Sequence, residues 1–393
     1  MAKNLSVLND QLFSLRPQSI PDFLKLVDKF EWNEKAESLD VLEFIDCTGG
    51  ICTDPKKWKA LLSLKDILTI RAPSSFPKLS IPVVVYELVL RVLRPRRIDQ
   101  KQFGLCGPAA FGCLLVQTRP LEYVRMAYDL LKCGRTHVAG LEINPRRRIR
   151  EFDPRGKMGQ ADWLIMASLR NSSKKLSQDM ENTGVYSNTY VWRMFEWLKQ
   201  AGYRTIVSIE TAENAWLSKP TRFRSQHYYP KKPDVLAKMT HEKLRNPSYN
   251  LRLAKRFLFN EWKVFLLITE KIAGTIGAED PIEKSVAPWK GLATDEKLDE
   301  MKADAKKALI GEKPNHWAMV TNIEITTEKK IRLTRFSYGT LEATAPVPQD
   351  IFNQIYGGFV AINEADMKDA FKHWRGRDAA VEPYPESGKA AKT

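Results

Sequence analysis

The stretch from Pro108 to Val116, PAAFGCLLV, contains no charged or hydroxyl-bearing side chain. At helical spacing it is apolar on every side, which is typical of a helix enclosed by the fold rather than lying on its surface. Enclosing such a helix requires a sizeable core. The chain has 393 residues, more than the roughly 250–300 residues at which a single core usually stops growing. We therefore expect two structural units or one elaborated domain.

Helical patterns dominate the first two thirds of the chain. Residues 1–97 are predicted to be mostly helical, and further helices are predicted as far as residue 262. The predicted helices lie near 5–15, 19–31, 56–70, 82–93, 119–133, 160–170, 188–201, 233–245 and 248–262. Two strands interrupt them, a short one at 40–46 and one at 203–210.

The last third of the chain changes to strand-like composition. The four segments rich in β-branched and aromatic residues are 264–268, 316–325, 331–338 and 358–362. An antiparallel sheet is the most economical assembly, with Thr326 to Lys329 as the turn between the second and third of these strands. The charged segment 292–313 is predicted to be a surface helix or insertion. Helices followed by strands indicate the α+β fold class.

Targeting and redox features are few. Residues 1–27 have no continuous apolar core with a cleavage site, so we expect no secretory signal and synthesis in a cytoplasm. The most apolar run, 81–90, contains a proline and a glutamate and is shorter than the ~20 residues of a membrane-spanning helix, which favours a buried helix. The five cysteines are an odd number, which argues against a disulfide framework. Cys47 and Cys52 have no histidine nearby, so we expect no metal and no other cofactor.

The chain is strongly basic, with a formal net charge of +15 and an isoelectric point near 9.4. Such a charge attracts an anionic partner. The basic residues gather at 91–97, 146–150 and 222–232. No nucleic-acid-binding motif accompanies them, so we do not expect a nucleic acid as partner. A solvated basic face, or a face matched to an acidic inhibitor protein, is the preferred interpretation.

Cys106 is the candidate nucleophile. It precedes Gly107 and Pro108, and proline is favoured at the first position of a helix, so the apolar helix is predicted to start just after the cysteine. The partial positive charge of a helix N-terminus lowers the pKa of a thiol placed there. Gly107 permits close approach of a substrate backbone, and amides at the helix start can hold an oxyanion. Cys113, on the same helix, is interpreted as core packing.

A thiol nucleophile needs a base, and His316 is the candidate among five histidines. It opens the predicted strand HWAMVTNIEI, directly after Pro314 and Asn315. This position predicts that the imidazole lies at the mouth of a cleft against the sheet edge. The sequence contexts of the other four histidines are less informative, those of His137, His227, His241 and His373.

The order of these parts resembles the papain-like cysteine peptidase superfamily, and within it the bacteriocin-processing peptidases and bacterial cysteine-protease effectors. Members have a glutamine shortly before a Cys-Gly-x-Ala motif that opens a central helix, and much later a histidine at the start of a strand. The corresponding residues here are Gln100 or Gln102, Cys106 to Ala109, and His316. The resemblance implies that Gln100, six residues before the cysteine, or Gln102 donates to the oxyanion.

The third catalytic position departs from the family pattern, which has an asparagine or aspartate on the strand after the histidine strand. That strand offers three hydroxyl side chains instead, those of Thr334, Ser337 and Tyr338. Asn315 and Asn322 flank His316 in sequence, but a neighbour along a strand points to the opposite face. We take Ser337 as the third residue, with Thr334 as its alternative. A Cys-His dyad assisted by a hydroxyl or a backbone carbonyl also satisfies the chemistry.

The resemblance also implies a domain organisation. A papain-like core, with the helix bearing the cysteine packed on an antiparallel sheet bearing the histidine, would occupy residues 98–375. The 210 residues between Cys106 and His316 exceed a minimal core, so a helical insertion is expected at about 150–260. Residues 1–97 form a helical N-terminal region. The composition after about residue 376 predicts a disordered tail.

One segment of the expected insertion, ADWLIMASLR at 161–170, is similar to segments of uncharacterised bacterial proteins of the effector type. Within it we interpret Asp162 as a helix start, Trp163 as a core aromatic residue and Arg170 as a surface or paired cation.

The function implied is a thiol hydrolase that cleaves a peptide or isopeptide bond, in a bacterial effector or toxin. Such a protein would be made in the bacterial cytoplasm and delivered into a target cell by an injection system that needs no signal peptide. Its expected partners are a protein or peptide substrate and an acidic inhibitor or immunity protein. Two alternatives stay open. One is a peptidoglycan amidase, endopeptidase or glutamine deamidase of the same fold, and the other is a basic binding protein without catalysis.

Overall fold

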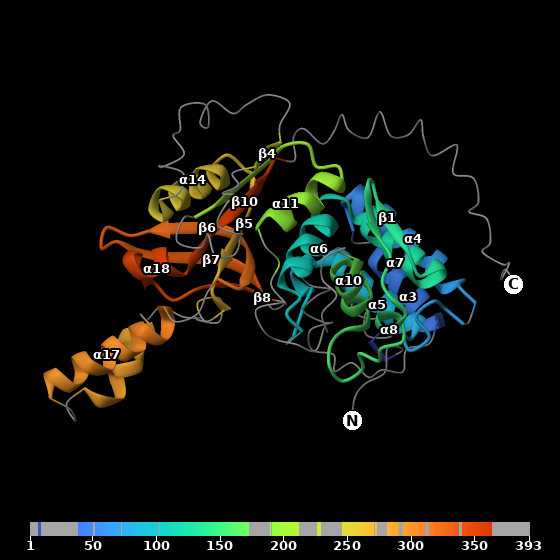
Figure 1. The fold of residues 1–393 in the computed structure, drawn as a ribbon. Helices are drawn as coiled ribbons and strands as arrows, with labels where there is room; N and C mark the ends of the chain where they lie inside the picture. Colours follow the sequence, from blue (N-terminus) through green and yellow to red (C-terminus); the bar gives the residue numbers. More distant parts are fainter. Residues whose placement is uncertain are drawn as a thin grey trace, which may run out of the picture.

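The computed structural model describes residues 7–8, 38–49, 52–71, 73–101, 103–172, 189, 191–211, 226–228, 246–270, 272, 281–290, 294–310, 314–337 and 340–363. These residues form a mixed α+β fold, in which a group of helices adjoins an antiparallel sheet (Figure 1). The predicted α+β class is therefore confirmed. The helices predicted at 19–31 and 233–245, most of the helix at 5–15 and the predicted tail lie outside the described residues.

Five helices form most of the helical group. They are α3 (Ser38–Gly49), α4 (Pro55–Leu68), α5 (Ile81–Leu93), α6 (Cys106–Thr118) and α7 (Pro120–Cys133). Local signals fix two of their ends. The Asp54 carboxylate accepts the backbone N–H of Lys56 at 2.9 Å at the start of α4, and Gly134, with a φ of 71°, ends α7. The sequence predictions for α4, α5 and α7 are confirmed.

The strand predicted at 40–46 is wrong, because this segment belongs to helix α3. Val41, Phe44, Ile45 and Thr48 are fully buried, and their spacing of three and four residues places them on one face of a helix. A strand would have directed Val41 and Phe44 to opposite faces. The need to bury both on the same side decided the structure.

Short elements connect α5 to α6 and α7 to the sheet. They are the 3₁₀-helix η1 (Pro95–Arg97), β1 (Thr136–Val138), β2 (Leu141–Ile143), α8 (Arg147–Arg150), α9 (Gln160–Asp162), the π-helix η2 (Trp163–Ala167), α10 (Ser168–Ser172) and α11 (Val191–Gln200). The sequence predicts helices near 160–170 and 188–201, and both are present. It does not reveal the β1–β2 hairpin, since strands of three residues are too short for a periodic signal.

The sheet runs in the order β4-β3-β10-β5-β6-β7-β8 across the described residues, and β9 pairs with β7. The strands are β3 (Ile206–Glu210), β4 (Gln226–Tyr228), β5 (Lys263–Ile268), β6 (His316–Ile325), β7 (Lys330–Ser337), β8 (Thr340–Ala343), β9 (Val347–Pro348) and β10 (Tyr356–Ile362). All printed pairings are antiparallel. The strand predicted at 203–210 and the four predicted in the last third are present as β3, β5, β6, β7 and β10.

The remaining helices follow β4 in the chain. They are α14 (Pro247–Phe259), α16 (Pro281–Val286), the 3₁₀-helix η5 (Ala287–Trp289), α17 (Asp295–Ile310) and α18 (Gln349–Ile355). Helix α17 forms over the predicted charged segment and extends away from the sheet in Figure 1. Among the described residues, no helix combines the length and apolarity needed to cross a bilayer.

The two faces of the sheet contribute to two different cores. Trp317 and Met319 of β6 belong to the core that contains α6, whereas Ala318 and Val320 belong to the core that contains α14 and α18. Consecutive strand residues point to opposite faces, so β6 serves both cores. Helix α6 has nearly all its side chains buried, which confirms the enclosed helix predicted from its sequence.

Candidate active site

Cys106 is the first residue of α6, which packs against β6. No side chain caps the start of the helix. The next residue, Gly107, lies so close to Thr189 that a Cβ on the glycine would overlap with the threonine side chain. The glycine is therefore required by close packing at the helix start, where the sequence had suggested room for a substrate backbone.

The Cys106 thiol is buried and 5% exposed. Its Sγ donates to the backbone carbonyl of Asn315 at 3.5 Å. Burial raises the pKa of the Cys106 thiol, because removal from water disfavours the thiolate. The backbone N–H of Trp317 and the charge of Arg170 act in the opposite direction on this pKa but do not reverse it. In this form of the site the neutral thiol is favoured.

His316 is the first residue of β6 and pairs with Ile268 of β5. It is 3% exposed, and β6 lies between β5 and β7, so the predicted position at the edge of the sheet is wrong. The physical reason is that β7 and β8 extend the sheet beyond β6. Burial, together with the positive charge of Arg335, lowers the pKa of the imidazole to about 3.

The alternation of side chains along β6 determines the face of the sheet from which the His316 side chain projects. Trp317 and Met319 face the core with α6, while Ala318 and Val320 face the opposite core. His316 shares the parity of Ala318 and Val320. Arg335 lies opposite Val320 in β7, and its charge lowers the pKa of the His316 imidazole. The hydrogen bond of the Cys106 thiol accordingly goes to the backbone beside His316 rather than to its ring.

A small pocket nevertheless brings together three predicted site residues that lie far apart in the sequence. Gln100, Cys106 and His316 all line it. The rest of its lining is apolar, from Ile98, Ala109, Ala110, Trp317 and Phe336. Gln100 is 4% exposed, and its amide oxygen has no hydrogen-bond partner among the described residues. A buried acceptor normally has a donor as partner, so this oxygen is able to accept a hydrogen bond from a donor group that enters the pocket.

The two hydroxyl candidates for the third position differ in their distance from His316. Thr334 lies opposite Asn322, six residues along β6 from His316, which is about 20 Å in a strand. The backbone of Ser337 is nearer, since it follows Phe336, which lies opposite Met319. Gln102 and Tyr338 lie outside the described residues.

Asn315 has a structural part in this arrangement. Its side-chain oxygen accepts the backbone N–H of Glu270 at 2.8 Å, and its own N–H donates to the carbonyl of Ile268 at 3.0 Å. These bonds fix the backbone that leads into His316. They also hold the carbonyl of Asn315 in place for the Cys106 thiol.

Thr189 and Arg335 are parts of the site that sequence reasoning missed. The Thr189 hydroxyl accepts from Nη1 of Arg170 at 3.2 Å, and its carbonyl accepts from Nε1 of Trp317 at 2.5 Å. No local pattern marks Thr189. Arg335 had a detectable signal, because it shares the face of Ile331 and Leu333 on β7, and a charged residue on an apolar strand face is unusual.

The described cysteines other than Cys106 do not join the pocket. Cys113 is fully buried in the α6 core, as predicted, and burial raises its pKa to about 12. Cys52 and Cys133 are free thiols. No group of three or more His, Cys, Asp or Glu side chains suited to a metal ion occurs in the described parts of the chain.

Not all of the basic clusters form a solvated face. Arg91 is 7% exposed and makes an ion pair with Asp162, at 2.6 Å from Nη2 to Oδ2. The interpretation of Arg91 as part of a solvated face is therefore wrong, because its helix α5 lies inside the core. Asp162 is a buried partner of this arginine, and Trp163 is the predicted core aromatic residue. Residues 146–148 are exposed, as predicted.

Comparison of the chain with protein-family models, curated proteins and solved structures finds no match.

Proposed function

We propose that the protein is a thiol hydrolase that cleaves a peptide or isopeptide bond. The observation that carries this proposal is that Gln100, Cys106 and His316, which lie far apart in the sequence, line one pocket between the start of α6 and the start of β6. A cysteine at a helix N-terminus, a histidine at a strand start and a glutamine upstream match the parts of a papain-like site. We propose a papain-like core on the same grounds.

The proposed reaction is acyl transfer in two halves. His316 takes the thiol proton while Sγ of Cys106 bonds to the substrate carbonyl carbon, and the imidazolium then protonates the leaving amine as the carbon–nitrogen bond breaks. The Gln100 amide and the backbone N–H of Cys106 stabilise the oxyanion. Water, deprotonated by His316, attacks the thioester and releases the acid and the thiol.

The charges of the resting site oppose the thiolate–imidazolium pair. Burial raises the pKa of Cys106, and burial with Arg335 lowers the pKa of His316. Both shifts favour neutral groups. We therefore propose that substrate entry opens the pocket and turns His316 from Arg335 towards Cys106. The neutral imidazole is already in the protonation state that a general base requires.

The partner class follows from the same proposal and from the charge of the chain. The substrate is a protein or peptide, and the net charge of +15 favours an acidic partner, such as an inhibitor that protects the producing cell of an effector or toxin.

The test uses peptidyl acyloxymethyl ketones, which alkylate an activated thiol held beside an oxyanion site. Mass spectrometry after exposure at pH 5 to 9 measures the rate at each cysteine. We expect labelling at Cys106 and a reduction of about 10²- to 10⁴-fold in His316→Ala, the usual contribution of a general base. Cys113→Ala is the matched control, since Cys113 lies on the same helix outside the pocket, and it leaves the Cys106 rate unchanged.

The same labelling experiment has an outcome that would contradict the proposal. If Cys106 reacts no faster than exposed Cys133 and its rate ignores His316→Ala, the hydrolase proposal fails. The bond from the Cys106 thiol to the Asn315 carbonyl would then be a structural contact. A basic binding protein without catalysis becomes the better account.

A further inference from the structure

The segment that carries Gln100 is attached to one particular residue of another element. The backbone N–H of Asp99 donates to Oδ2 of Asp162 at 3.2 Å. The Asp99 carboxylate in turn accepts the N–H of Lys101 at 2.9 Å, which closes a turn around Gln100. Lys101 has a φ of 50°, a left-handed conformation that needs such support. The conformation at Gln100 therefore depends on Asp99 and its acceptor.

The other side of this turn is held by the residue after Asp162. The N–H of Phe103 donates to the carbonyl of Gln100 at 3.3 Å. The Phe103 ring packs edge-on against Trp163, with centroids 5.5 Å apart. Trp163 is itself fixed, since its Nε1 donates to the carbonyl of Ile149 at 3.1 Å. Two consecutive residues thus hold the two ends of the turn around Gln100.

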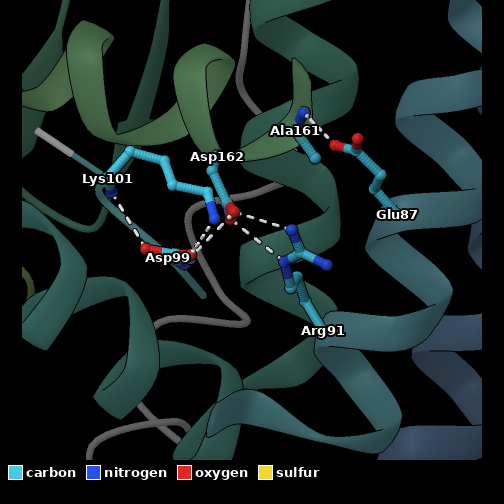
Figure 2. A network of polar contacts seen from close by, with 6 residues as sticks. All are labelled: Glu87, Arg91, Asp99, Lys101, Ala161 and Asp162. Carbon is cyan, nitrogen blue, oxygen red and sulfur yellow. Dashed lines mark hydrogen bonds and ion pairs between the residues drawn. The ribbon is translucent and has the colours of Figure 1, made fainter. Parts of the chain in front are cut away.

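A side chain of α5 holds the Asp162 carboxylate in place. Nε and Nη2 of Arg91 donate to its two carboxylate oxygens at 3.1 and 2.6 Å, as Figure 2 shows. The Glu87 carboxylate accepts the N–H of Ala161 at 2.7 Å, one turn of α5 away. A Cβ on Gly159 would lie 3.1 to 3.2 Å from Arg91, Glu87 and Asp162, so the network is closely packed. Asp162 is 1% exposed.

The stability of a packed core does not require the ion pair in this network. A buried ion pair contributes little net stability compared with apolar side chains of similar size. What the Arg91–Asp162 pair adds is a fixed acceptor for Asp99. The π-helix that begins at Trp163 is of a kind that often occurs at functional sites.

We propose that Asp162 and Trp163 are positioning residues for Gln100, which rests on the proposed function of the pocket. Asp162 fixes the backbone before Gln100, and Trp163 fixes the backbone after it. They act on the amide that stabilises the oxyanion and do not touch the substrate. Loss of this support displaces the Gln100 amide while Cys106 and His316 keep their places.

The test removes the acceptor together with the arginine that pairs with it, while Glu87, which the charge of Arg91 also stabilises, keeps its bond from the N–H of Ala161. The double variant Arg91→Met with Asp162→Leu replaces the ion pair by apolar side chains of similar length, an exchange that is often neutral for stability. The substrate is the peptidyl aminocoumarin amide whose peptide gives the fastest acyloxymethyl ketone labelling. We expect kcat to fall about 10- to 100-fold, as for a displaced oxyanion donor, with KM within about twofold. Asp153→Asn, which breaks the exposed ion pair with Arg155, leaves kcat unchanged.

A mutant cycle separates positioning from a general structural effect. In a Gln100→Ala background the amide is already absent, so the double variant should reduce kcat by less than about twofold, because its effect passes through Gln100. Trp163→Phe keeps an aromatic face for Phe103 and retains most of the activity, whereas Trp163→Leu does not. Equal losses with and without Gln100 overturn the inference.

Amide hydrogen exchange gives a readout that needs no activity. We expect faster exchange at Asp99 and Lys101 in the double variant, and no change at Leu114 inside α6. Unchanged exchange at Asp99 and Lys101 overturns the positioning inference, even in an active enzyme. A wild type that hydrolyses none of the amides and shows no selective Cys106 labelling overturns the proposed function instead, so the two failures are distinguishable.

Discussion

His316 is held neutral by its surroundings. Burial and the charge of Arg335 act in the same direction and lower the pKa of the imidazole to about 3. A general base works best with a pKa near the working pH, so the closed site is a resting form rather than a reactive one. Catalysis as proposed depends on separating His316 from Arg335.

The same neutrality has a consequence for stability against pH. The unfolded chain takes up a proton at His316 below pH 6.5, whereas the folded chain resists it until about pH 3. The unfolded state therefore binds more protons in this window, and the free energy of unfolding falls as the pH falls through it. His316→Gln removes this contribution. At pH 4 the wild type should have lost roughly 3 kcal/mol more than the variant relative to pH 7, since one pKa unit corresponds to about 1.4 kcal/mol.

Urea unfolding at pH 7, 6, 5 and 4 measures this difference, and other titrating groups cancel between the two proteins. Parallel losses in wild type and His316→Gln would show that the imidazole is not buried as a neutral group.

Strand β10 illustrates how a single glycine shapes an element. Its pairing with β5 shifts register between Tyr356 and Gly358. Gly358 has a φ of 127°, and a Cβ there would overlap with the backbone of Ile209 in β3. The glycine thus allows β10 to lie between β3 and β5 at its irregular point. Any side chain at this position forces β10 away from β3.

We expect Gly358→Ala to lower the free energy of unfolding by about 3 kcal/mol or more, because it combines backbone strain with a clash against a strand. Gly156→Ala is the matched control, since Gly156 also has a positive φ of 71° but no atom within 4 Å of an added Cβ. Strain alone should reduce its stability by about 1 kcal/mol. Denaturant unfolding compares the two, and equal losses would exclude the clash with β3.

At the scale of the whole molecule, the sheet joins two cores. Leu266 and Leu267 are consecutive residues of β5, and Leu266 packs in the core with α14 and α18 while Leu267 packs in the core with α6. Neither core can lose its sheet face without exposing the other. The two cores should therefore unfold together rather than one after the other.

Leu266→Ala and Leu267→Ala test this coupling. Each should destabilise the protein by about 2–5 kcal/mol, the usual range for a buried leucine. Far-ultraviolet circular dichroism follows the helices and tryptophan fluorescence follows tertiary packing, and we expect both signals to shift together in either variant. Two separated transitions, with only one moved by each substitution, would show that the cores are independent.

Local periodicity let the sequence predict most of the elements. The enclosed helix from Cys106 and the strand that opens at His316 were both predictable, because apolar spacing and start signals act over a few residues. The sequence also selected Gln100, Cys106 and His316, although it did not show that they line one pocket. The sequence predicts a strand where α3 forms, because a short apolar segment fits both the helical period and the strand period.

Tertiary structure alone decided the properties of the site. The burial of His316 and the pairing of Arg91 with Asp162, which joins residues 71 positions apart, both arise from contacts between distant segments. Such contacts carry no local pattern, so composition assigned Arg91 to a solvated surface. The sequence determined which side chains are able to do chemistry. Which of them are held neutral, paired or fixed in place was decided by long-range packing, since desolvation and neighbouring charge arise only when distant segments meet.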